Sequence, residues 1–179
     1  MTDERYEAMK QIRDDVLNLK ESPLYEYRQE NNYFPVLGQG SHHAEIFFIG
    51  EAPGKNEAET GRPFCGASGR VLDELLESVS LRRDDVYVTN VVKDRPPDNR
   101  DPHRAEIYLY APFLDRQIAI VQPAVIATLG RFAMEFVIQR YSSRTDTRCN
   151  QCTSQRCKCR DNFTPNSCCK VYKCWSKLL

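Results

Sequence analysis

The sequence lacks three features that would assign it to common classes of protein. No apolar run approaches the roughly 20 residues that a membrane-spanning helix needs, and the first residues do not form a basic and apolar leader peptide. Lys and Arg together number 25, as do Asp and Glu, so no overall positive field attracts nucleic acid. We therefore expect a cytoplasmic protein with no membrane partner, in which any contact with an anion comes from local basic groups.

Cysteine is scarce over most of the chain and crowded at its end. Only Cys65 precedes Cys149, although the sequence has eight cysteines. The apolar periodicity also stops near residue 142, where a polar, Cys-rich composition begins. We therefore predict one domain over residues 1–141, incomplete at its C-terminal end, and a separate Cys-rich tail over residues 142–179.

Three explanations of this tail compete. Cys149 and Cys152 with Cys157 and Cys159 approximate a zinc site, although the second pair is one residue short of the usual spacing. The polar composition is also typical of disorder. A reading-frame error or truncation is the interpretation we favour, because it explains both the change of composition and the lack of a fourth strand.

Periodic apolar residues predict helices and strands in alternation. Helical spacing is found at residues 3–20, 68–81, 102–122 and 131–140. Short apolar and β-branched runs predict buried strands at residues 44–49, 85–92 and 124–129. This order predicts an α/β fold, a three-layer α/β/α arrangement with a central parallel sheet.

The loops after the first two predicted strands contain the residues suited to chemistry. Ligands of open parallel sheets bind beyond the carboxyl ends of the strands. Residues 50–57 and 61–69 are rich in glycine and proline and lead into a helix, which also fits a generic phosphate-binding loop. Neither a Gly-Lys-Ser/Thr ending nor a Gly-x-Gly-x-x-Gly pattern follows the first strand, which counts against that generic interpretation.

Asn90 ends the second predicted strand. Its carboxamide can accept the N3–H of uracil and donate to O4, although a strand-end Asn often only closes a turn. Lys93, Arg95 and Arg100 follow, held by prolines, and are our candidates for contacts with DNA phosphates. Because three Asp residues lie among them, a solvated, salt-bridged loop is the alternative.

These motifs together resemble the family 4 uracil-DNA glycosylases. The similarity lies, in order and spacing, in residues 50–54, 61–66, 89–97, 112–114 and 128–130. The resemblance covers about residues 16–140 and implies a monomeric DNA-repair hydrolase of the base-excision pathway. Such a glycosidase flips uracil out of uracil-containing DNA and hydrolyses its N-glycosidic bond.

The resemblance also implies roles for four residues. Glu51 resembles the polar residue that orders the catalytic end of the first loop, and Ala52 supplies backbone to the uracil. Phe64 resembles the ring on which the flipped base stacks, and Asn90 the residue that reads it. We therefore predict Glu51 and Asn90 as catalytic and all four as uracil-binding, and we expect Glu51, Phe64 and Asn90 to converge on one cleft.

The sequence departs from the family at the positions expected to hold a four-iron four-sulfur cluster. The matching positions are Leu19, Ser22, Asp94 and Tyr110, none of which is a thiolate. We therefore predict no cofactor and no metal at this place. Packing by Leu19, Leu24 and Tyr110 is expected to fill it.

A second departure concerns the late His-Pro motif of the family, whose His donates to the departing uracil. No His follows His103 in this chain. In other enzymes, removal of one such donor costs about 3–4 kcal/mol of transition-state stabilisation. We therefore expect a lower rate of cleavage. The rival hypotheses are a non-catalytic DNA-binding relative and a zinc-binding interaction protein that acts through the Cys-rich tail.

Overall fold

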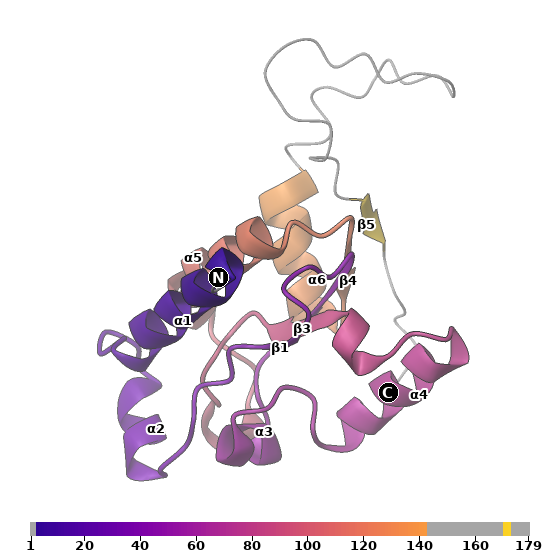
Figure 1. Ribbon diagram of the computed structural model, residues 1–179. Coiled ribbons are helices and arrows are strands. Elements are labelled where there is room, and N and C mark those ends of the chain that lie inside the picture. The colour runs from indigo at the N-terminus through magenta and orange to yellow at the C-terminus, as the bar shows by residue number, and fades with distance from the viewer. Residues whose placement is uncertain (1–2, 143–169, 173–179) are drawn as a thin grey trace.

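The computed structural model describes residues 3–142 and 170–172 and has an α/β architecture (Figure 1). The helices are α1 (Glu4–Leu17), α2 (Tyr25–Glu30), α3 (Lys55–Thr60), α4 (Ala67–Ser78), α5 (Arg104–Val121) and α6 (Arg131–Val137). The strands are β1 (Gln39–Gly40), β2 (Ile46–Gly50), β3 (Tyr87–Asn90), β4 (Val125–Thr128) and β5 (Lys170–Tyr172). Short 3-10 turns lie at Arg83–Asp85 and Pro97–Asn99, and a π-helical turn at Ile138–Ser142 follows α6.

The strands form one sheet in the order β1-β3-β2-β4-β5. β2 pairs in parallel with both β3 and β4, β4 pairs in parallel with β5, and only β1 is antiparallel to its neighbour. The register places Gly50 opposite Asn90 and Ile49 opposite Thr128. The carboxyl ends of the three central strands therefore lie at one edge of the sheet.

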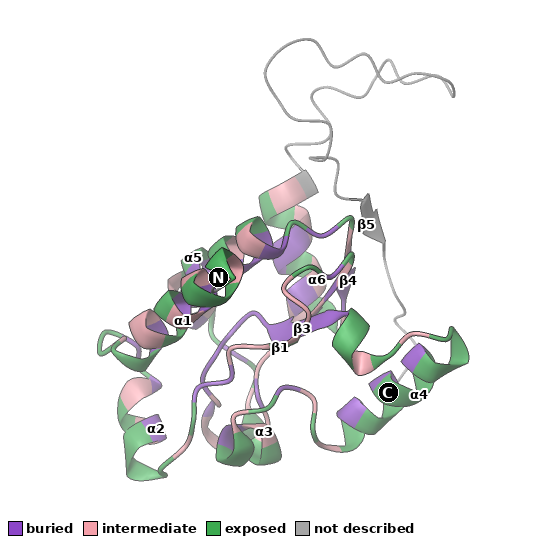
Figure 2. Ribbon diagram, viewed as in Figure 1, coloured by how far each residue is buried: buried purple, intermediate pink, exposed green. Residues whose placement is uncertain are grey.

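The two faces of the sheet are covered by different helices, because successive side chains of β2 point to opposite faces and are apolar on both. Phe47 and Ile49 pack with apolar residues of α1, α5 and α6 in the larger core. Ile46 and Phe48 pack on the other face, against Leu72 and Leu76 of α4. The central strands are accordingly buried, whereas the outer faces of the helices are exposed (Figure 2).

This arrangement confirms the predicted three-layer α/β/α class with a central parallel sheet. Each predicted strand and long helix is present, with ends that differ by a few residues. The segment before β2, which lies outside the helices and strands expected from the sequence, contains the short α2 and β1. Leu24, Val36 and Arg28 are buried there, so this segment is part of the packed body.

The Cys-rich tail falls largely outside the described residues, and so do all its cysteines and the zinc, disorder and reading-frame explanations. β5 lies in the predicted tail and pairs in parallel with β4, so the expectation that the chain lacks a fourth parallel strand is wrong. The boundary at residue 141 stays a prediction. Within the part of the chain that the structure describes, no helix is long and apolar enough to cross a membrane.

Candidate functional site

Phe64 and Asn90 meet above Gly50, where β2 ends. A Cβ atom placed on Gly50 would lie 2.4 Å from Oδ1 of Asn90 and 2.5 Å from Cζ of Phe64. Gly50 and Asn90 are register partners, so both project toward the α4 side of the sheet, where Phe64 packs. The ring and the carboxamide are therefore close neighbours over a strand end that only glycine can occupy without displacing them.

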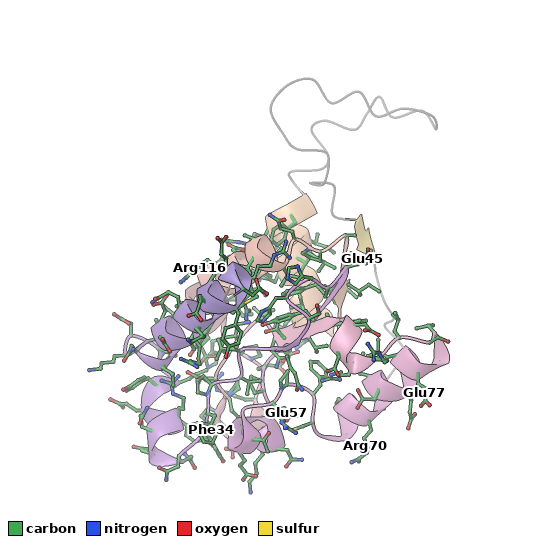
Figure 3. All side chains as sticks on the ribbon, in the orientation of Figure 1. Phe34, Glu45, Glu57, Arg70, Glu77 and Arg116 are labelled. Carbon is green, nitrogen blue, oxygen red and sulfur yellow. The ribbon has the colours of Figure 1, made fainter. Side chains whose placement is uncertain are left out.

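The loop that carries Phe64 is held by two charged residues. Oε1 of Glu57, on α3 (labelled in Figure 3), accepts the backbone N–H groups of Cys65 at 3.0 Å and Gly66 at 2.9 Å. Nη2 of Arg83 donates to the carbonyl of Pro63 at 2.8 Å. Neither role was predicted from the sequence, because nothing in the spacing of Glu57 or Arg83 indicates which backbone groups they reach.

Phe64 itself has a strained backbone. Its φ is 52°, in the left-handed region that a bulky residue rarely adopts. A Cβ on Gly69, in the first turns of α4, would lie 1.7 Å from the Phe64 carbonyl oxygen, so this glycine allows the loop to approach the helix. Strain of this kind clusters at ligand sites and persists where the surroundings enforce it. The loop thus holds the ring in one place.

Asn90 is buried, yet its carboxamide is available for binding. The residue is 2% exposed, and its side chain makes no hydrogen bond with any residue of the described segments. Buried polar groups are normally paired, so an unpaired donor and acceptor at a strand end indicate a missing partner. An amide presents one donor and one acceptor side by side, which suits the edge of a nucleobase.

Glu51 lies at the same edge of the sheet, on the side of β4. Its Oε2 would lie 3.8 Å from a Cβ atom on Gly130, and its backbone carbonyl accepts Val92 N–H at 3.1 Å. Burial raises the pKa of the Glu51 carboxyl, nearby Asp101 raises it further, and Arg131 opposes both. No hydrogen-bond donor among residues 3–142 reaches this carboxylate. It is therefore a partly desolvated carboxylate open to a ligand or water.

The geometry brings the other predicted residues together only in part. Phe64 and Asn90 adjoin each other above Gly50, whereas the Glu51 carboxylate lies beside Gly130. Ala52 is half-buried in the loop after Glu51 and packs against the larger core. All four stand at one edge of the sheet, where loops after neighbouring strands meet.

The structure contradicts one of the predicted phosphate contacts. Lys93 is 0% exposed, and its ammonium donates to Thr89 Oγ1, the Asn90 carbonyl and Gln117 Oε1. A side chain beneath the sheet edge cannot reach DNA, so the prediction of a DNA contact is wrong for Lys93. The sequence misled because lysine is rarely fully buried, and its place in a basic, Pro-rich loop indicated exposure.

Arg95 and Arg100 lie nearer the surface, but among residues 3–142 only Arg100 of the two is paired with a carboxylate. Arg100 donates to both carboxylate oxygens of the buried Glu106, at 2.6 and 2.9 Å, which neutralises it. Arg95 donates to the hydroxyl of Tyr33 at 2.7 Å and to Asn99 Oδ1 at 2.8 Å. No carboxylate of the described residues pairs with Arg95, so its charge is the freer of the two.

Three of the four positions that match the cluster ligands of the family, Ser22, Asp94 and Tyr110, form a buried polar network. The Ser22 hydroxyl lies 2.8 Å from that of Tyr110, which donates to Asp94 Oδ2 at 2.6 Å. Arg28 pairs with Asp94 at 2.9 Å and donates to the carbonyls of Val16 and Leu17 at the end of α1. Leu19 and Leu24 pack in the adjoining core, as expected, but the charged pair was not foreseen.

This donor set does not fit such a cluster. It offers a hydroxyl, a phenol and a carboxylate that already bond to one another and to Arg28, and no thiolate. Among the described residues no group of three or more His, Cys, Asp or Glu could hold a metal ion. No step of the chemistry proposed below passes through a cluster.

An open parallel sheet that presents a ring and a free carboxamide at its carboxyl edge is typical of a ligand-binding α/β domain. The sequence model of the uracil DNA glycosylase superfamily matches residues 37–175. That range is more than half of the chain and includes every residue of the predicted pocket. The chain belongs to this superfamily.

Individual relatives agree with this assignment. A type-4 uracil-DNA glycosylase of Sulfurisphaera tokodaii is 43% identical over 147 residues, which cover 79% of this chain and 65% of that protein. The type-4 enzyme of Archaeoglobus fulgidus is 43% identical over 135 residues, or 75% of this chain and 66% of that protein. A type-5 uracil-DNA glycosylase of Pyrobaculum aerophilum is 32% identical over 126 residues, covering 62% of this chain and 55% of that protein.

These similarities confirm the resemblance to family 4 found in the motifs. The chain spans about two thirds of the length of the type-4 relatives.

Proposed function

We propose that the protein is a uracil-DNA glycosylase, which extrudes uracil from DNA and hydrolyses the bond between its N1 and the sugar C1′. The observation that carries this proposal is the meeting of the Phe64 ring and the unpaired Asn90 carboxamide above Gly50. The names of the type-4 relatives support the same substrate. We also propose that the protein acts in the cytoplasm and as a monomer.

The proposed pocket recognises the base by its face and its edge. The extruded uracil stacks on Phe64, which contributes on the order of 1–3 kcal/mol per base. Asn90 Oδ1 accepts the N3–H of uracil while Nδ2 donates to O4, and cytosine offers the opposite pair at these positions. The backbone of Ala52 contacts the base from the β2 side. Because Asn90 has no competing partner within the described residues, its carboxamide is free to bind uracil in this way.

The proposed reaction is heterolysis of the glycosidic bond, without a covalent nucleophile. Negative charge develops on uracil and positive charge on the sugar as the bond breaks. The Glu51 carboxylate is partly desolvated and has no donor from residues 3–142, so it is suited to stabilise the sugar cation and to hold the attacking water.

The proposed DNA contact centres on Arg95, with Arg100 in a lesser role. The Arg95 guanidinium is held over the Tyr33 ring, 5.3 Å from its centroid, and no carboxylate neutralises it among the described residues. Arg100 already satisfies the two oxygens of Glu106. A phosphate would therefore gain more from Arg95.

A release assay tests the proposal. Full-length protein is mixed in excess with a labelled single-stranded oligonucleotide that contains one uracil, and free uracil is measured over time. Release by the wild type that falls steeply in Asn90→Ala and Phe64→Ala supports the proposal. Arg70→Ala, on the exposed face of α4 (Figure 3), is the matched surface control.

Binding without cleavage is the second candidate function, favoured by the Phe64 ring and the Asn90 carboxamide, which can receive a base whether or not its glycosidic bond is broken. Uracil-containing DNA that binds more tightly than the thymine version, with no uracil released, would replace the first proposal by the second. Equal binding of both oligonucleotides and no release would contradict both.

A further inference from the structure

A buried lysine lies directly behind the residue proposed to read the base. Lys93 follows Asn90 by three positions, and the chain after β3 turns so that its ammonium returns beneath the strand end. Nζ lies 2.6 Å from the carbonyl oxygen of Asn90, 2.8 Å from Thr89 Oγ1 and 2.6 Å from Gln117 Oε1. Three donors therefore meet three acceptors, and each is used once.

Burial of the charged Lys93 ammonium is unfavourable for the free energy of folding. Lys93 is fully buried, and no carboxylate of the described residues pairs with it. Burial lowers the pKa of the Lys93 ammonium well below its ordinary value. An apolar side chain of similar length would avoid this cost but would leave three buried acceptors without this donor, so the value of the amine lies in the hydrogen bonds that it makes to them.

The three acceptors link Lys93 both to Asn90, which is proposed to bind the base, and to the surrounding core of the protein. The Thr89 hydroxyl donates to the carbonyl of Leu37 at 2.5 Å, and Gln117 Nε2 donates to the same carbonyl at 2.8 Å. On the other side of β3, the N–H of Val91 donates to the Gly50 carbonyl at 2.9 Å. The strand end is therefore fixed by β2 on one side and by Lys93 on the other.

We propose that Lys93 is a positioning residue: by donating to the Asn90 backbone carbonyl, it holds the Asn90 carboxamide beside Phe64 in the geometry that receives uracil. The inference rests on the proposed function for its kinetic consequence, although the contact itself does not depend on it. Asn90 projects to the α4 face of the sheet, whereas Lys93 bonds to Gln117 of α5 on the opposite face. The lysine thus acts through the backbone and never touches the base.

A double-mutant cycle in uracil release tests this role. Lys93→Met keeps the length of the side chain and removes its donors, and we expect it to lower kcat by about ten- to hundredfold with a smaller change in KM, because small misplacements cost this much. In the Asn90→Ala background the same substitution should have no further effect. Full activity in Lys93→Met, or losses that multiply in the double variant, would overturn the proposal.

Two further variants separate positioning from loss of structure. Thr89→Val keeps a β-branched side chain and removes one acceptor of the ammonium, so we expect a milder loss of kcat that also vanishes in the Asn90→Ala background. Tyr110→Phe removes a buried hydroxyl from the Asp94 network without touching Lys93 and should lower stability but leave kcat unchanged. If Lys93→Met does not fold, a Thr89→Val loss that persists without Asn90 overturns the proposal.

A spectroscopic measurement does not require activity. The Nδ2 amide resonances of Asn90, assigned by their loss in Asn90→Ala, should shift or broaden in Lys93→Met and Thr89→Val but not in Tyr110→Phe. Unchanged Asn90 resonances in both variants would contradict the positioning role. If these shifts occur while the wild type releases no uracil, the proposed function fails and the positioning role stands.

Discussion

Adding one methyl group at Gly50 is expected to damage the proposed pocket more than the fold. The Cβ of Gly50→Ala would lie 2.4 Å from Asn90 Oδ1 and 2.5 Å from Phe64 Cζ, closer than real Cβ contacts allow. Gly50 does not have a positive φ, so alanine fits the backbone and the conflict is with the two side chains alone. Because Asn90 and its strand are buried, we expect the Phe64 loop to move away from the added methyl group.

The expected loss of activity follows from the free energy of stacking between uracil and the Phe64 ring. Loss of stacking is worth about 1–3 kcal/mol, which corresponds to roughly 5- to 150-fold in kcat/KM for uracil release. Overpacking a buried position costs about 1–3 kcal/mol of folding free energy, so the variant should stay folded while its activity falls. Single-turnover release and urea unfolding of the same preparation measure the two effects separately.

A second variant shows whether the methyl acts through the ring. In a Phe64→Ala background one of the two obstructions is absent, so Gly50→Ala should cost less activity there than in the wild type. The reasoning would be refuted by a folded Gly50→Ala protein that releases uracil at the wild-type rate. It would also be refuted by equal losses with and without the ring.

Three other predictions concern charge. Asp94→Asn leaves Arg28 as an unpaired buried charge and should lower the free energy of unfolding by about 3–5 kcal/mol, measured with urea; a change below about 1 kcal/mol would contradict this. Glu51→Gln should reduce uracil release yet raise the urea midpoint at pH 7, because the raised pKa makes the ionised carboxylate destabilising above that pKa. The gain should vanish below the ordinary carboxyl pKa, where both folded and unfolded states are protonated; no gain at pH 7 would count against the assigned burial. Arg95→Ala should weaken DNA binding and reduce the slope of log K against log salt by about 1, and an unchanged slope would exclude a phosphate contact.

The strands and long helices could be predicted because each depends on a local pattern. The apolar run before Gly50 forms β2, and the periodic residues after Ser68 lie on α4, since burial on a face repeats with the period of the element. The short α2 and β1 were missed because they are too short to show a period. β1 has two residues and depends on pairing with β3, which no local pattern contains.

The charged residues of the interior could not be predicted, for a physical reason. Arg28 and Lys93 are polar in the sequence, and burial is decided by partners distant in the chain: Asp94 for the arginine, Gln117 for the lysine. Polar residues at strand ends can be found from sequence because the carboxyl edge of a parallel sheet is a general ligand site. Their neighbours, such as Glu57 and Arg83 around Phe64, depend on the three-dimensional course of the loop.

A titration with free uracil tests the proposed pocket most directly, since it requires neither DNA nor turnover. We predict that the Asn90 side-chain amide and the Phe64 ring resonances shift together with one dissociation constant as uracil is added. Cytosine should leave both unchanged, because its donor and acceptor are reversed. Uracil that shifts neither residue, or that shifts residues away from the carboxyl edge of the sheet, would contradict a uracil pocket formed by Phe64 and Asn90.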